Sequence, residues 1–247
     1  KARARALEGA DGGATRMEVV VGVDLEPRGR GCGDQYGLMV LRAKADPGSR
    51  RDQALDRCWR WAACHDHSHR LLVAAGACLI NDVRALQAPG ALAAAAEAGA
   101  GVCLMHMRGE PRTMQVDPQY RSVVDDVRTD LRARIAACEA AGIPRERICV
   151  DPGIGFGKRP EHNLALLAAL DRLADPAIPV LVGVSRKSLL GIITGRPTGE
   201  RLAGSVALAA LSVMRGAAIV RAHDVAATVD AVKVASALRR AAAGGSG

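Results

Sequence analysis

Cations and hydroxyls gather at the end of an apolar segment, in the sequence VGVSRKSLLG at residues 182–191. Ser185 contributes a hydroxyl, and Arg186 and Lys187 contribute the charges. Residues 179–184 are apolar and predict a buried strand, and α/β proteins place their chemistry where such strands end. We therefore expect a site here, and its cations favour an anionic small molecule.

Two further apolar segments end in ionisable residues. ICVDPGIGFGK, at residues 148–158, presents Asp151, and AIVRAHD, at residues 218–224, presents Arg221 and His223. Arg221 and His223 are two positions apart, so a strand would point both the same way, and together they could clamp a phosphate. A single charged residue commonly marks only where a strand leaves the core, but three strands ending this way favour a site.

A fourth strand adds an amide to this set. Asn81 follows an apolar pair in CLINDV, and its side chain can donate and accept hydrogen bonds, as the edge of a heterocycle requires. Asp151 supplies an acceptor beside it. An acid and an amide for a polar ring, with cations for phosphate, indicate a ring-bearing phosphate ester as the ligand.

Strands and helices alternate from residue 78 onward, which predicts a parallel sheet with helices outside it. No GxGxxG motif is present, so we expect a TIM (β/α)8 barrel rather than an open doubly wound sheet. Residues 1–70 would hold about three further strands, irregular or incomplete, with candidates at 18–25 and 36–43. We expect one domain at residues 1–242 and a flexible tail at 243–247. The predicted strands are 78–83, 102–107, 148–150, 179–184 and 219–223, and the predicted helices are 89–98, 123–141, 163–173, 200–215 and 224–240.

Composition narrows the class of protein. The 247 residues are 49% hydrophobic but only 2% aromatic, which argues against a single-stranded nucleic-acid binder despite a net charge of +8. Seven cysteines without a CxxC pair, several of them in apolar segments, indicate buried thiols in a reducing, cytoplasmic protein. We find no run of transmembrane length and no signal peptide, so we expect no membrane association.

One segment carries side chains that could bind a metal. In CWRWAACHDHSHR, at residues 58–70, the histidines His65, His67 and His69 alternate, as ligands on one face of a strand would. There is no strand pattern and no second ligand group at structural-zinc spacing, so a polar loop is the favoured interpretation and a metal site the alternative.

Five motifs, in order, resemble those of the dihydropteroate synthase family, the folate-pathway enzymes that sulfonamides inhibit. The resemblance covers about residues 71–234. It implies a TIM-barrel transferase, usually a homodimer, that uses Mg2+. The reaction would condense 4-aminobenzoate with (7,8-dihydropterin-6-yl)methyl diphosphate, giving 7,8-dihydropteroate and pyrophosphate. The five motifs are INDVRAL, CLMHMRGEPRTMQ, DPGIGFGK, VGVSRKSLLG and VRAHDV.

The resemblance also implies roles for individual residues. Asp151 and Lys187 would be catalytic, Asp151 by stabilising a cationic centre as diphosphate leaves. Ser185 and Arg186 would bind the aminobenzoate. The pterin diphosphate would be bound by Asn81, Met105, Asp151, Phe156, Gly183, Lys187, Arg221 and His223.

The first third departs from the family. The first-strand motif Asn-Val-Thr-Pro-Asp-Ser-Phe, which supplies a magnesium ligand and a lid, is absent, so the metal ligands are unknown. GGATRM at residues 12–17 partly matches the next motif, and Asp24 or Asp66 could replace an aspartate of the strand after it. The alternatives are therefore a pterin-binding homologue without full activity, or a methyltetrahydrofolate-type methyltransferase, which would not need SRKS or Arg-x-His. DNA binding by charge alone is a more distant alternative.

Overall fold

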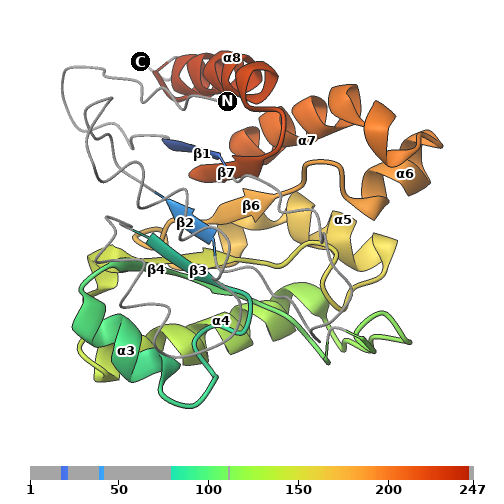
Figure 1. The fold of residues 1–247 in the computed structure, drawn as a ribbon. Coiled ribbons are helices and arrows are strands. Elements are labelled where there is room, and N and C mark those ends of the chain that lie inside the picture. Colours follow the sequence, from blue (N-terminus) through green and yellow to red (C-terminus); the bar gives the residue numbers. More distant parts are fainter. Residues whose placement is uncertain (1–17, 22–38, 42–78, 111, 245–247) are drawn as a thin grey trace, which may run out of the picture.

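The computed structural model describes residues 18–21, 39–41, 79–110 and 112–244, in which strands and helices alternate (Figure 1). This alternation confirms the five βα units expected from residue 78 onward. The strands of these units are β3 (Leu79–Asp82), β4 (Gly101–Met105), β5 (Ile148–Asp151), β6 (Leu181–Gly183) and β7 (Ile219–Ala222). The helices are α3 (Ala91–Ala98), α4 (Val123–Ala140), α5 (Pro160–Ala168), α6 (Ser188–Thr194), α7 (Leu202–Met214) and α8 (Val225–Gly244). Short 3-10 turns occur at Arg145–Arg147, Leu170–Arg172 and Thr198–Glu200.

The strands of the five units run parallel. β3 pairs with β4 and β4 with β5, while β6 pairs with β7, and a bridge between Val150 and Val180 links the two groups. From the first third, β1 (Glu18–Val21) pairs parallel with β7, as a barrel requires. In contrast, β2 (Met39–Leu41) runs antiparallel to β3, which departs from the all-parallel order and is the irregularity expected in this part of the chain.

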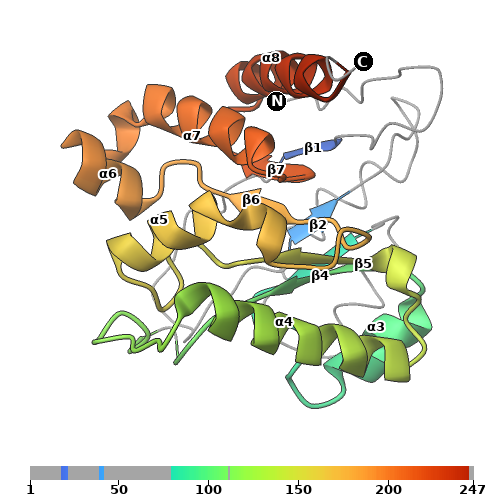
Figure 2. The same ribbon diagram turned by 180° about the vertical axis from the view of Figure 1, so that it is seen from behind.

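The helices lie on the outside of the strands. Figures 1 and 2 show α3 and α4 on one side of the molecule and α7 and α8 on the opposite side, with the strands between them. The larger buried cluster joins helices to strands through residues such as Leu131, Val150 and Val220. Successive side chains on a strand point to opposite faces. The strand residues that alternate with those facing the helices therefore form a second set.

That second set is a smaller cluster facing inward. Its members are one residue from each of five adjacent strands, the arrangement of a side-chain layer inside a barrel. Cys103 and Cys149 are directly opposite each other in the register, and both are buried free thiols, as is Cys138. The layer consists of Leu79, Cys103, Cys149, Leu181 and Ile219.

Several predicted boundaries were wrong. α5 begins at Pro160, three residues before the predicted start, because proline fits the first helical position and His162 Nδ1 accepts a hydrogen bond from the Arg159 amide. Leu164, expected on the apolar stripe of this helix, is 46% exposed, and Leu166 is buried instead. The helix α6 was missed, and α8 continues to Gly244 rather than ending at residue 240.

Some predictions fall outside the described residues. The metal-capable segment at 58–70 and the partial motif at 12–17 lie there, and of the two early candidate strands only residues 18–21 and 39–41 are described. The domain boundary at residue 242 stays a prediction. Among the described helices, none is long and apolar enough to cross a membrane.

Candidate active site

The predicted site residues form the next layer above the inner cluster. Each strand places one residue of that cluster inside the barrel, and the residue two positions further on points the same way. On β3, for example, Leu79 belongs to the cluster and Asn81 lies above it. On each of the four other strands, the residue two positions after the cluster member likewise lies at the carboxyl end of the strand. This is the end at which barrel enzymes place their chemistry. The upper layer is therefore Asn81, Met105, Asp151, Gly183 and Arg221.

Arg221 connects the two groups that were expected to bind a heterocycle. Its Nη1 donates a hydrogen bond to Oδ1 of Asn81 at 2.9 Å, and its Nη2 lies 3.1 Å from Oδ2 of Asp151. Asn81 and Asp151 are almost completely buried, with 3% and 1% exposure. The planar guanidinium can meet two partners at once, so one side chain holds the amide and the carboxylate in fixed relative positions.

Gly183 makes this arrangement possible. A Cβ atom at this position would lie 2.5 Å from Nη2 of Arg221, closer than atoms can approach without moving. The glycine on β6 therefore leaves the space through which the Arg221 side chain crosses the barrel mouth. This explains in physical terms why an apolar strand carries a glycine at its end.

The carboxylate of Asp151 is held by its own turn. Oδ1 accepts a hydrogen bond from the Gly153 amide at 2.8 Å. Oδ2 has the ion-pair contact with Arg221, but its geometry does not make a hydrogen bond, so this buried oxygen has no donor directed at its lone pairs. A buried carboxylate oxygen of this kind can accept a hydrogen bond from a bound molecule.

Phe156 and Lys187 are in direct contact. The Lys187 ammonium lies 4.2 Å from the centre of the Phe156 ring, a cation–π distance. Gly155, between Asp151 and Phe156 in the chain, packs against the Lys187 side chain. The β5–α5 and β6–α6 segments therefore meet at Phe156 and Lys187, two of the residues predicted to bind the pterin diphosphate.

The remaining predicted residues form two pairs between β6 and β7. Ser185 Oγ accepts a hydrogen bond from the His223 amide at 3.2 Å and lies 3.0 Å from His223 Nδ1. Arg186 binds both carboxylate oxygens of Asp224, at 2.6 and 3.1 Å, and the pair lowers the pKa of Asp224.

Two further arginine and serine contacts were not anticipated. Arg201 donates from Nη1 to the carbonyl oxygens of Arg186 and Lys187, at 3.0 and 3.3 Å, and Ser205 Oγ accepts from the Arg186 amide at 2.9 Å. Arg186 has a positive φ of 58°, so these bonds stabilise a turn that its backbone would not otherwise favour. Arg201 and Ser205 lie at the start of α7, with helix α6 between them and the SRKS motif, so their spacing in the sequence gave no signal of these contacts.

Lys158 and His106 form a buried pair behind the upper layer. Lys158 Nζ lies 2.9 Å from His106 Nδ1, and Lys158 is only 3% exposed. Burial lowers the pKa of Lys158 to about 7. Burial, together with the charge of Lys158, lowers the pKa of His106 to about 3. Lys158 was not among the expected site residues.

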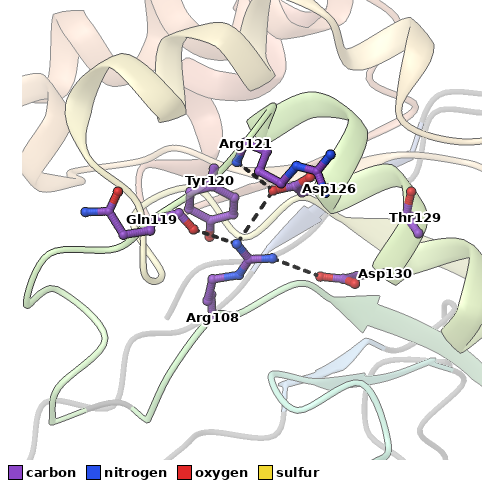
Figure 3. Close-up of a pocket in the computed structure, with 7 residues that line it drawn as sticks. All are labelled: Arg108, Gln119, Tyr120, Arg121, Asp126, Thr129 and Asp130. Carbon is purple, nitrogen blue, oxygen red and sulfur yellow. Dashed lines mark hydrogen bonds and ion pairs between the residues drawn. The ribbon is translucent and has the colours of Figure 1, made fainter.

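A separate cavity of about 460 Å3 lies between the β4–α4 segment and the first turns of α4 (Figure 3). Arg108 is at its centre, stacked 4.3 Å from the centre of the Tyr120 ring. Its guanidinium lies 3.6 Å from Asp126 and 3.8 Å from Asp130. None of the predicted site residues lines this cavity, whose lining is Arg108, Gln119, Tyr120, Arg121, Asp126, Thr129 and Asp130.

The described residues do not supply a metal centre. Magnesium prefers several carboxylate or carbonyl oxygens. Within residues 79–110 and 112–244, no three Asp, Glu, His or Cys side chains come together as a metal site. The carboxylate of Asp151 is already engaged by Arg221 and Gly153. The Mg2+ requirement stays a prediction.

This chain is similar in sequence to known pterin-binding enzymes. The family model described as "Pterin binding enzyme" matches residues 68–223. Among curated proteins, the dihydropteroate synthase of Escherichia coli strain K12 is 50% identical over 162 residues, which are 66% of this chain and 57% of the relative. The chain therefore spans less than two thirds of the length of this relative.

Solved structures of dihydropteroate synthases are similar to this chain in fold as well as in sequence. The dihydropteroate synthase of Yersinia pestis, in a complex with a sulfonamide drug, is 46% identical with a TM-score of 0.69, covering 72% of this chain and 65% of the other. The enzyme of Burkholderia cenocepacia, complexed with 7,8-dihydropteroate, is 53% identical with a TM-score of 0.67, covering 72% and 66%. These similarities confirm the predicted TIM-barrel class.

Proposed function

This chain belongs to the family of pterin-binding enzymes, and we propose that it is a dihydropteroate synthase. It would join 4-aminobenzoate to (7,8-dihydropterin-6-yl)methyl diphosphate and release pyrophosphate. The relatives of known structure support this substrate class, since one of them is complexed with 7,8-dihydropteroate and another with a sulfonamide.

One observation carries the proposal. Asn81, Asp151 and Arg221 come from three different strands, and the Arg221 guanidinium lies 2.9 Å from Asn81 and 3.1 Å from Asp151. An amide, a carboxylate and a planar cation at one depth offer acceptors and donors to the polar edge of a pterin ring. Met105, buried on β4 in the same layer, and the Phe156 ring supply apolar surface for the faces of the ring.

The chemistry assigned to these residues is a substitution at carbon. The bond between the pterin methylene carbon and the diphosphate oxygen breaks, and that oxygen takes both electrons. The aminobenzoate nitrogen forms the new bond to the methylene carbon and then loses one proton to solvent. Positive charge develops on the pterin as diphosphate leaves, and the Asp151 carboxylate stabilises it because the charge is fixed in a buried, pre-arranged position.

Cations at the layer's rim would stabilise the departing group. Lys187, Arg221 and His223 lie at the ends of β6 and β7. The resemblance assigns Arg221 and His223 to the diphosphate and Lys187 to the pterin. Ser185 and Arg186 would bind the aminobenzoate on the same side. Their contacts to His223 and Asp224 support this, because they fix both side chains beside the proposed diphosphate site.

The resemblance also supports Mg2+ dependence, a homodimer and a cytoplasmic location, which we include in the proposal. Exposed apolar side chains on the neighbouring helices α7 and α8 support a dimer, since such residues commonly mark an interface. Sedimentation of the purified chain tests this point. These exposed side chains are Leu211, Met214, Val234 and Leu238.

Pyrophosphate release tests the activity. The chain is incubated with both substrates, with and without Mg2+, and each substrate is omitted in turn as a control. We expect release only when both substrates are present. Tight pterin binding without release would favour the homologue lacking full activity, and methyl transfer from methyltetrahydrofolate would favour the methyltransferase.

A further inference from the structure

Lys158 is a buried cation surrounded by acceptors. Its Nζ lies 2.9 Å from His106 Nδ1 and 2.9 Å from the carbonyl oxygen of Phe156. Two more carbonyl oxygens, those of Gly153 and His106, lie at 3.1 and 3.3 Å. An ammonium group has three donors and no acceptor, so these neighbours suit the charged form of the side chain.

The partners of His106 fix the position of its proton. Nδ1 faces the Lys158 ammonium, which can only donate, so Nδ1 must be the unprotonated nitrogen. Nε2 lies 3.2 Å from Oδ2 of Asp130 on α4, which accepts, so Nε2 carries the hydrogen. A neutral His106 therefore relays a chain of hydrogen bonds from Lys158 to Asp130, and its ring cannot rotate without breaking both.

The backbone of the β5–α5 segment packs directly on the end of β4. A Cβ at Gly153 would overlap the carbonyl oxygen of His106, and one at Gly157 would overlap that of Arg108. Both glycines have positive φ, near 65° and 63°, which other residues rarely adopt. Lys158 donates hydrogen bonds across this contact, to His106 on one side and to Gly153 and Phe156 on the other.

The residues held by Lys158 are those that shape the upper layer. Gly153 accepts from Lys158 through its carbonyl oxygen and donates from its amide to Oδ1 of Asp151 at 2.8 Å. Phe156 accepts through its carbonyl oxygen, while its ring lies against Lys187. Movement of either backbone group would therefore displace the carboxylate or the ring.

We propose that Lys158 is a positioning residue for the pterin slot, acting through the bonds that fasten the Gly153–Phe156 turn to His106. This inference rests on the proposed function for its link to catalysis. The fastening itself does not depend on that function. Lys158 has no role in the reaction described above, and it acts through Asp151 and Phe156 rather than on the substrate.

The test replaces Lys158 with methionine, an unbranched side chain one atom shorter that removes all donors. Lys158→Met is compared with Lys233→Met, a matched change at an exposed lysine on α8. Amide hydrogen exchange is measured at Gly153, Gly155 and Phe156. We expect exchange there to accelerate at least about tenfold in Lys158→Met, since the turn loses its fastening, with no change in the control.

Kinetics separate positioning from general stability. Lys158→Met is assayed well below its melting temperature. Its kcat/KM for the pterin diphosphate should fall on the order of 100-fold, through both a lower kcat and a higher KM, because a small displacement of reacting groups is costly. KM for aminobenzoate should stay within about twofold of the wild type, as expected for a site on another segment. Equal changes in both KM values, or wild-type exchange and kinetics, would overturn the proposal.

A second measurement needs no variant. Nitrogen NMR of histidine-labelled wild-type protein at pH 5, below the pKa of Lys158 and above that of His106, should show His106 neutral with the hydrogen on Nε2. A proton on Nδ1 would overturn the proposal, because Lys158 could then not donate to it. If the wild type neither binds pterin nor releases pyrophosphate, the proposed function fails, while the exchange and NMR results still decide whether Lys158 fastens the turn.

Discussion

Arg221 Nη1 donates a hydrogen bond to Asn81 Oδ1 at 2.9 Å, joining residues 140 positions apart in the chain. The bond crosses the mouth of the barrel from β7 to β3. These strands are not neighbours in the hydrogen-bonded order, since β7 pairs with β1 and β6. The contact therefore depends on closure of the strands around the inner cluster, and it brings two sequence-predicted site residues together without any ligand.

Replacing Asp151 with asparagine should weaken pterin binding and lower turnover by a few kcal/mol of transition-state stabilisation. The amide keeps the size of the side chain but removes the charge opposite Arg221 and the developing cation. Calorimetry with the pterin alcohol and the pyrophosphate assay measure the two effects. Asp230→Asn, at an exposed position on α8, is the control. Unchanged affinity and rate in Asp151→Asn would remove this residue from the site.

Replacing Arg221 with lysine should not be conservative. A lysine keeps the charge, but a single ammonium cannot reproduce the fork that meets Asn81 and Asp151 together. We expect a loss of about 1–3 kcal/mol in affinity for the pterin alcohol. The loss for the diphosphate ester should be larger.

The exposed Arg215→Lys change is the matched control for this experiment. Comparison of the two ligands separates the proposed roles of Arg221. Equal losses for alcohol and ester would show that Arg221 serves the pterin ring alone and does not bind the diphosphate.

Replacing Gly183 with alanine should displace the Arg221 side chain, because the new methyl group would lie 2.5 Å from Nη2. The displaced Arg221 would lose its bonds to Asn81 and Asp151, which costs about 1–3 kcal/mol of unfolding free energy. Thermal melting and pterin affinity should both decrease. Gly199→Ala, where a Cβ would meet nothing within 4 Å, is the control. A stable Gly183→Ala protein with wild-type affinity would contradict the arrangement described here.

The low pKa of His106 predicts a loss of stability in acid. Its pKa is about 3 in the fold, because of burial and the nearby charges of Lys158 and Arg108, against an ordinary value of 6.5. Between these values the unfolded chain binds a proton that the folded chain does not, so the free energy of unfolding falls as pH drops from about 6.5 to 3. The loss attributable to this group is roughly 3–5 kcal/mol.

Denaturant unfolding across this pH range measures the effect. His106→Asn has no titrating group at this position. The fall in its free energy of unfolding between pH 6.5 and 3 should therefore be smaller than that of the wild type by roughly 3–5 kcal/mol. The difference between the two curves removes the contribution of carboxylates common to both proteins. Parallel curves would show that His106 takes up its proton as readily in the fold as in the unfolded chain.

The upper layer could be predicted from the sequence because strand geometry is simple. Asn81, Asp151 and Arg221 each lie two positions after an apolar residue near the end of an apolar segment, so they had to point into the barrel at its carboxyl end. The same reasoning could not predict that Arg221 would bind the other two. That pairing depends on the space left by Gly183 and on the distance across the barrel.

Lys158 was missed for a physical reason. Lysine is almost never fully buried unless it is paired, and its partner, His106, lies 52 positions earlier in the chain. Helix α6 was missed because seven residues are too few to show a helical period. Among the described strands, the direction of β2 could not be predicted either, since three apolar residues do not encode whether a strand runs parallel or antiparallel.

The contact between Lys187 and Phe156 gives the proposed slot a built-in spectroscopic reporter. Phe156 is the sole phenylalanine in the 247 residues. A protein grown with fluorinated phenylalanine would therefore show one fluorine resonance, from the ring that lies 4.2 Å from the Lys187 ammonium. A pterin stacking on that ring would shift this resonance through its ring current, so ligand occupancy could be followed at a single atom.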